Sequence, residues 1–167
     1  ILGGVTWDIT AKTQGLFKAG YADKNYDDDD ADDAEEWMAE GQLSMIFTPK
    51  TSLRLIAYRR LMESDFRFSD YILRNNVGAD FNLRMTSKLS FGFGVGYTFD
   101  EYEGELLDGG ELKEREDDFY TISPSLTFDM FRWLSASLVY SYQNRNSNIT
   151  GFDYTKNVIT LAVQGTL

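Results

Sequence analysis

The sequence contains no cysteine and no histidine among its 167 residues. The lack of cysteine excludes disulfide bonds and thiolate metal sites. The lack of histidine removes the usual base of Ser-His-Asp and Cys-His catalysis, and it removes imidazole ligands for a metal. Paired carboxylates could still act as acid and base, but the acids lie in runs with no apparent apolar pocket to raise a pKa. We therefore expect a protein that is not an enzyme and that carries no cofactor.

The sequence also lacks long hydrophobic runs and has only two prolines. No stretch approaches 18 uninterrupted apolar residues, so no transmembrane helix is predicted. The mean hydropathy of −0.36 is that of a soluble protein, but membrane β-barrels reach such values because their strands alternate polar with apolar residues. Aromatic residues make up 15% of the chain, and membrane barrels use aromatic rings in girdles at both interfaces.

Acidic residues outnumber basic ones and give a net charge of −11, which argues against nucleic acid as a partner. The acids are concentrated in two runs, residues 27–36 with eight carboxylates and residues 101–118 with nine. We expect these runs to form long acidic loops near 27–35 and 103–117.

The first acidic run raises the question of a cation site, because hard cations such as calcium bind several oxygens at once. The weak candidates for metal ligands are its six aspartates, Asp27, Asp28, Asp29, Asp30, Asp32 and Asp33. The run contains no glycine and lacks the spacing of an EF-hand loop, so a solvated, self-repelling loop is the favoured interpretation. Weak divalent binding that bridges to lipopolysaccharide phosphates is the alternative.

The clearest pattern is the strict alternation LSFGFGVGYTF over residues 89–99. Every odd position is large and apolar, and every even position is glycine, serine or threonine. Neighbouring side chains of a strand point to opposite faces, so the pattern predicts a strand with one aromatic face and one small, polar face. The glycines either leave space in a barrel lumen or mark a bend in its wall. Similar segments predict nine strands, at 4–11, 15–26, 36–47, 52–62, 70–84, 88–102, 118–128, 134–146 and 154–167.

The connections between the predicted strands alternate in length. Short connections are expected near 12–14, 48–51, 85–87 and 129–133, and long ones at 27–35, 63–69, 103–117 and 147–153. Up-and-down membrane barrels show this asymmetry, with tight periplasmic turns and long external loops. A soluble sandwich or barrel is the alternative, because it has the same alternation with its apolar face inside.

Two features favour the membrane barrel over the soluble alternative. The polar face is mostly Ser, Thr, Gly, Gln and Arg, which suits a hydrated lumen. Large rings also collect near the segment ends, where interfacial girdles lie; they are Trp7, Trp37, Phe47, Tyr58, Tyr71, Tyr97, Phe99, Tyr120, Phe128, Trp133, Tyr142 and Tyr154. We therefore predict an all-β fold, an antiparallel up-and-down transmembrane β-barrel in the bacterial outer membrane.

The odd number of predicted strands is unusual for such a barrel. Bacterial single-chain barrels have an even number of strands, with both termini in the periplasm. The chain also begins at Ile1 with neither an initiator methionine nor a signal peptide, as a processed or truncated product does. We therefore expect residues 1–167 to form one barrel segment, the C-terminal part of a larger barrel.

Seven charged residues are predicted to line the lumen. They are Lys18, Glu40, Arg54, Arg60, Arg74, Asp80 and Arg84. A charge on the lipid face costs about 2–4 kcal/mol at the bilayer midplane, so these side chains are expected to point inward. A wall of arginines facing carboxylates selects polar or anionic solutes, whereas in a narrow barrel the same residues pair and fill the interior. Arg59 breaks the alternation and is expected at the membrane interface or at a β-bulge.

Short phrases spread over the chain carry a family resemblance. They are 7–13 (WDITAKT), 48–51 (TPKT), 132–134 (RWL), 140–148 (YSYQNRNSN), 153–158 (DYTKNV) and 162–167 (AVQGTL). These phrases resemble the bacterial outer-membrane β-barrels called putative β-barrel porin type 2, which are associated with exopolysaccharide export. The resemblance implies a role in passing polysaccharide through the outer membrane. It also implies lipopolysaccharide and periplasmic polysaccharide-export proteins as partners.

The leading functional hypothesis is a passive outer-membrane channel for an anionic or neutral polysaccharide or another polar solute. The alternative is a non-transporting structural or adhesive barrel with acidic external loops. Strand number separates the two, because about eight strands enclose a filled interior and about 16 leave an aqueous passage.

Overall fold

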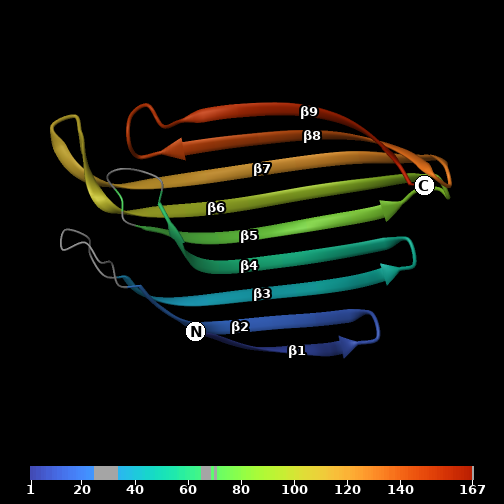
Figure 1. The fold of residues 1–167 in the computed structure, drawn as a ribbon, viewed down its shortest axis with the longest axis horizontal. Helices are drawn as coiled ribbons and strands as arrows, with labels where there is room; N and C mark the ends of the chain where they lie inside the picture. Colours follow the sequence, from blue (N-terminus) through green and yellow to red (C-terminus); the bar gives the residue numbers. More distant parts are fainter. Residues whose placement is uncertain (25–33, 65–68, 70, 167) are drawn as a thin grey trace.

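The computed structural model of the chain describes residues 1–24, 34–64, 69 and 71–166, and it folds them into one antiparallel sheet (Figure 1). The nine strands follow sequence order, so each strand is hydrogen-bonded to its neighbours in the chain. They are β1 (Leu2–Thr10), β2 (Thr13–Lys24), β3 (Ala34–Thr48), β4 (Thr51–Glu63), β5 (Tyr71–Arg84), β6 (Leu89–Asp108), β7 (Glu111–Phe131), β8 (Leu134–Ser147) and β9 (Tyr154–Gly165). None of the described residues belongs to a helix long and apolar enough to span a membrane.

The predicted fold class is confirmed, since the described chain is all-β with up-and-down connections. The turns that follow β1, β3, β5 and β7 lie at one end of the sheet, on the right in Figure 1, which we call the end with the tight turns. The last residues of β2, β4, β6 and β8 lie at the other end, which we call the long-connection end, although β6 joins β7 there through two residues only. Each of the nine predicted strands corresponds to one observed strand, with most bounds shifted by one to three residues.

The predicted loop at 103–117 is wrong, because most of this segment is paired strand. β6 continues to Asp108 and β7 begins at Glu111, and the two intervening glycines have positive φ angles of 61° and 93°. Positive φ at both central residues is the geometry of a two-residue hairpin turn. Lys113 Nζ lies 3.6 Å from Asp108 Oδ2 and 3.7 Å from Glu111 Oε2. At the turn, a cation therefore lies between two carboxylates that face each other, and it reduces their repulsion.

The two faces of the sheet differ in chemistry. Phe93 and Val95 of β6 project from one face and are 38% and 40% exposed, whereas Gly94 and Gly96 lie on the other face. The cross-strand register carries the same alternation from β1 to β9. We call the two surfaces the apolar face and the polar face. Exposed side chains of the apolar face include Val5, Phe17, Val77, Phe93, Val95, Ile122, Leu126, Phe128, Leu138, Ile159, Leu161 and Val163.

The described sheet is a single layer without a conventional core (Figure 1). Among the described residues, only three hydrophobic side chains are buried, those of Ile72, Leu73 and Ile149. Soluble monomers rarely leave a contiguous apolar surface of more than a few hundred Å² facing water. A sheet with one continuous apolar face therefore fits a hydrocarbon environment better than the interior of a soluble sandwich.

The sheet is not closed, and β1 and β9 form its two edges. Every neighbouring pair of strands is antiparallel. Both edge strands consequently run in the same direction, toward the end with the tight turns (Figure 1).

A close contact fixes β1 on β2. Trp7 lies opposite Gly15 in the register, and a Cβ atom added to Gly15 would lie 2.5 Å from Cζ2 of the indole. The Trp7 ring therefore covers the backbone of β2 at a point where only glycine leaves room. Gly3, which also lies on the apolar face of this hairpin, has open space where its side chain would be.

We predict that Gly15→Val displaces the Trp7 indole and lowers the free energy of unfolding by about 1–3 kcal/mol, the usual cost of overpacking. Gly3→Val is the matched control and should be neutral or slightly stabilising, because valine favours strands. Urea unfolding in detergent micelles, followed by tryptophan fluorescence, measures both effects. Equal stability of the two variants would contradict the role of this contact.

Candidate functional site on the polar face

The seven charged residues predicted to line a lumen all lie on the polar face of β2–β5. The register sets Lys18 opposite Glu40, Arg54 opposite Asp80, and Arg60 opposite Arg74. Arg84 lies at the end of β5, beside the tight turns, and joins no ion pair among the described residues. The structure therefore brings six of the seven into cross-strand pairs and leaves Arg84 apart. That the polar face lines a lumen stays a prediction.

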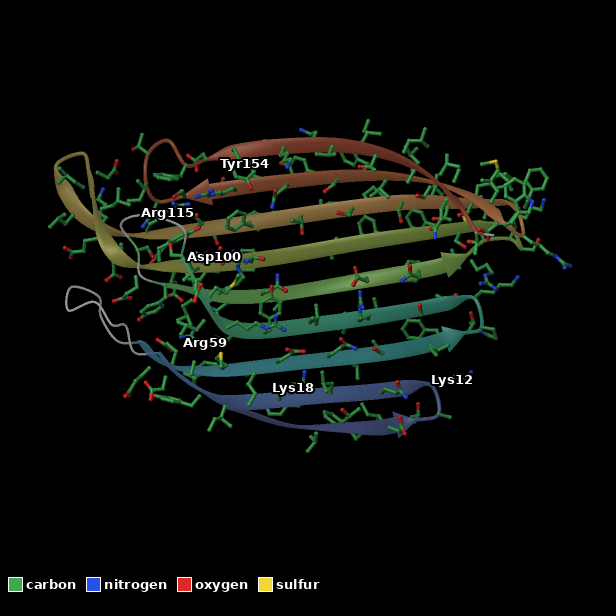
Figure 2. The ribbon with its side chains drawn as sticks, in the orientation of Figure 1. Lys12, Lys18, Arg59, Asp100, Arg115 and Tyr154 are labelled. Carbon is green, nitrogen blue, oxygen red and sulfur yellow. The ribbon has the colours of Figure 1, made fainter. Side chains whose placement is uncertain are left out.

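A row of charged side chains crosses the polar face in the half nearer the long connections, and we call this row the belt. Figure 2 labels three of its members, Lys18, Asp100 and Arg115. The belt consists of Lys18 on β2, Glu40 on β3, Arg60 on β4, Arg74 on β5, Asp100 on β6, Arg115 and Asp117 on β7, and Arg145 on β8. It spans seven of the nine strands.

The first half of the belt is centred on Glu40. Lys18 Nζ lies 3.6 Å from Glu40 Oε1, and Arg60 Nη2 donates a hydrogen bond of 2.6 Å to Glu40 Oε2. One carboxylate thus neutralises only part of the charge of two cations on the neighbouring strands.

The second half of the belt holds two carboxylates that face each other. Asp100 and Asp117 are opposite in the register, and both are fully buried. Like charges directly opposite destabilise a strand pair, so each must be compensated. Arg74 donates to both oxygens of Asp100, at 2.7 Å from Nε and 2.5 Å from Nη2. Asp117 is contacted by Arg115 Nη2 at 2.6 Å and Arg145 Nη2 at 2.7 Å.

Arg115 is held between two aromatic rings. Its guanidinium carbon lies 4.1 Å from the centroid of Tyr102 and 3.9 Å from that of Phe152, and the residue is only 4% exposed. Phe152 belongs to the connection between β8 and β9, in which Ile149 is also buried. Asn148 of the same connection accepts a hydrogen bond from the Glu116 amide at 2.9 Å. The connection is therefore fastened to β7 and packs on the belt.

A hollow of about 300 Å³ lies on the polar face nearer the tight turns. Arg54 and Asp80 lie on one side of it, and Arg54 Nη2 is 2.8 Å from Asp80 Oδ2. A Cβ atom added to Gly94 would lie 3.2 Å from Asp80 Oδ1, and one added to Gly92 would lie 2.5 Å from Ser125 Oγ. The glycines of β6 thus leave room for polar side chains of both neighbouring strands.

Arg59 lies on the apolar face at the long-connection end. Its guanidinium stacks on Trp37 at 4.8 Å, and its Nη2 donates to Glu36 at 3.2 Å. The β4–β5 register runs without a shift through Arg59, so the interpretation of a β-bulge is wrong. A contact between a cation, a carboxylate and an indole suits the interfacial position that was the other expectation.

Two rings expected in the aromatic girdles lie on the polar face instead. Tyr58 is opposite Glu40 in the register, and its ring lies 4.4 Å from the guanidinium carbon of Arg60. Tyr154 is opposite Arg145, whose guanidinium carbon lies 5.7 Å from the tyrosine ring. Nearness to a segment end does not decide which face a ring occupies, and both rings accompany arginines of the belt.

Four members of the belt were not singled out from the sequence, namely Asp100, Arg115, Asp117 and Arg145. Two of them fall in the segment 103–117 that the sequence predicted as a loop. The signal that could have identified Asp100 is its even position on β6, which continues the glycine series of the polar face. Arg145 similarly continues the odd positions that hold Ser137 and Ser141 on β8.

The six aspartates considered as weak cation ligands, Asp27, Asp28, Asp29, Asp30, Asp32 and Asp33, lie outside the described residues. Of the acidic loop predicted at 27–35, only residues 34 and 35 are described, and they belong to β3. Within the described part of the chain, no group of three or more acidic side chains could hold a metal ion.

Comparison with known proteins yields one match. A family model described as Putative beta-barrel porin 2 matches residues 1–166. No curated protein and no solved structure matches the chain.

We predict that Asp100→Asn lowers the free energy of unfolding by about 1–3 kcal/mol, because it weakens the two charge-assisted hydrogen bonds that Arg74 donates to this buried carboxylate. Asp80→Asn makes the same chemical change in an ion pair whose two side chains are 57% and 45% exposed. An exposed pair contributes about 0–1 kcal/mol, so this control should fold nearly as stably as the wild type. Urea titration of the refolded protein measures the stability of both variants. Equal losses of stability would show that burial does not determine how much each ion pair contributes.

Proposed function

Because the chain belongs to the Putative beta-barrel porin 2 family, we propose that it forms a channel for polar solutes in the bacterial outer membrane. The apolar face contacts lipid in this proposal, and the polar face lines a water-filled lumen. The observation that carries the proposal is the separation of the two faces across all nine strands. A barrel wall between hydrocarbon and water requires this separation, and a passive channel requires no covalent chemistry or cofactor.

The strand lengths support a membrane-spanning wall. About 9–11 residues of tilted strand cross the hydrocarbon core, and the shortest observed strand, β1, has nine residues. β6 and β7 have 20 and 21 residues and would extend well beyond the membrane at the long-connection end. The acidic β6–β7 hairpin then lies in water, where its carboxylates are solvated.

The open edges support a larger, closed barrel. In hydrocarbon, the unpaired backbone groups of β1 and β9 would each cost several kcal/mol, so both edges need partner strands. Since β1 and β9 run in the same direction, an antiparallel closure takes an odd number of further strands. The total is then even, as in bacterial single-chain barrels. We propose that the nine strands are one part of such a barrel.

Polysaccharide is the solute that we propose for this channel. The polar face of β6–β8 carries small and hydroxyl side chains, including Gly94, Ser123, Ser125, Ser137 and Ser141. Such a surface offers many weak hydrogen bonds to sugar hydroxyls without a deep binding site. Lipopolysaccharide around the barrel and periplasmic polysaccharide-export proteins are the proposed partners.

A second candidate is a non-transporting structural or adhesive barrel whose side chains close the interior. The ion pairs of the belt and the packing of Phe152 on Arg115 favour this candidate at the long-connection end. The two candidates differ in whether an open passage remains beside the belt.

Planar-bilayer recording distinguishes the two candidates. We predict that the refolded full-length protein, with every strand of the closed barrel, produces discrete current steps whose size rises with KCl concentration, and that linear oligosaccharides reduce the current in a concentration-dependent way. Heat-modifiable migration on a gel confirms that the inserted protein is folded. A folded, inserted protein without current steps would contradict the channel and support the structural barrel. Current steps that no oligosaccharide affects would retain the channel and contradict polysaccharide as its solute.

A further inference from the structure

We propose that the belt is an anion-recognition site, and that the channel selects solutes bearing carboxylate, phosphate or sulfate groups. This inference rests on the proposed function and adds to it the charge of the solute.

Cations outnumber carboxylates in the belt. Five positive side chains, Lys18, Arg60, Arg74, Arg115 and Arg145, share three carboxylates, Glu40, Asp100 and Asp117. The chain as a whole has a net charge of −11, so the net charge of the belt is opposite in sign to that of the whole chain. A local excess of positive charge on a wall of low dielectric constant concentrates anions from the adjoining water.

The depth of the charges is as important as their number. The carboxylate side chains of Glu40, Asp100 and Asp117 are 17%, 0% and 0% exposed, whereas those of Lys18, Arg60 and Arg74 are 40%, 49% and 28% exposed. The other two cations, Arg115 and Arg145, are only 4% and 15% exposed. Lys18, Arg60 and Arg74 therefore lie above the carboxylates, and a solute that moves along the polar face meets these three cations first.

Arg145 adds charge to the belt but no accessible donor. Its Nη2 lies 2.7 Å from Asp117 Oδ2, and neither Nη2 nor Nε has a hydrogen-bond partner of good geometry among the described residues, but both atoms are buried. The donors that a solute can reach belong to the more exposed cations, such as Arg60. A guanidinium offers five N–H donors in a planar fork, which matches the oxygens of carboxylate and phosphate. Rows of charged side chains of this kind determine the ion selectivity of a pore when the solute passes close to its wall.

The experiment is the reversal potential of the reconstituted channel in a tenfold KCl gradient, with chloride as the probe anion. The wild type should pass chloride in preference to potassium. Lys18→Gln together with Arg60→Gln removes two exposed cations of the belt and should lower the chloride-to-potassium permeability ratio by about threefold or more. Lys12→Gln together with Lys50→Gln makes the same change of charge in two tight turns outside the belt, and should leave the ratio unchanged.

The double substitution in the belt leaves Glu40 without its partners and can hinder folding. The triple variant K18Q/E40Q/R60Q removes that carboxylate as well, still lowers the net positive charge of the belt, and should give a smaller reduction of the ratio. A conducting wild type that prefers potassium, or a ratio equally affected by the belt and turn variants, would overturn the anion site and leave the channel intact. A folded, inserted protein without conductance would overturn the channel, and the anion site with it.

Discussion

The structure depends on one constraint. A β-sheet that is one layer thick contacts two different environments, and successive residues of each strand must suit one environment and the other in turn. A shift of one residue in any strand pair would move phenylalanines to the polar face and arginines to the apolar face. The register of all eight strand pairs keeps most of the two sets apart, with exceptions such as Arg59 on the apolar face and Phe119 opposite Arg145 on the polar face. With three buried hydrophobic side chains in the described chain, the sheet cannot draw its stability from an internal core. It must draw that stability from hydrogen bonding between strands and from lipid on the apolar face.

The belt shows how the polar face manages charge under this constraint. Asp100 and Asp117 are opposite each other and removed from water, an arrangement that is unfavourable unless guanidinium groups compensate it. Arginines from β5, β7 and β8 supply that compensation, and Tyr102 and Phe152 fix the most deeply buried of them. The same ion pairs that join β5 to β6 and β7 to β8 thus surround the buried carboxylates with positive groups. In the proposed channel, the elements that stabilise the wall also determine which solutes pass it.

The alternation in the sequence was sufficient to predict the strands, their up-and-down order and the face of seven charged residues in β2–β5. The period of two is a local property, and each apolar position is visible in the chain itself. The extent of β6 and β7 could not be predicted in the same way, because a dense acidic run indicates a loop until its cross-strand neighbours are known. Lys113 beside Asp108 and Arg74 beside Asp100 are separated by five and 26 residues in the sequence, and only the fold brings each pair together. The packing of Phe152 on Arg115 likewise depends on contacts that no local pattern encodes.

The central claim is that the apolar face contacts hydrocarbon while the polar face contacts water. The chain has no native cysteine, so single cysteines can be introduced and spin-labelled one at a time over residues 91–98 of β6. Electron paramagnetic resonance in lipid bilayers then measures the access of oxygen, which dissolves in hydrocarbon, and of a water-soluble nickel complex. The account predicts that odd positions favour oxygen and even positions favour nickel, with a period of two. Odd positions inaccessible to both reagents would show a dry protein interior and would contradict the account.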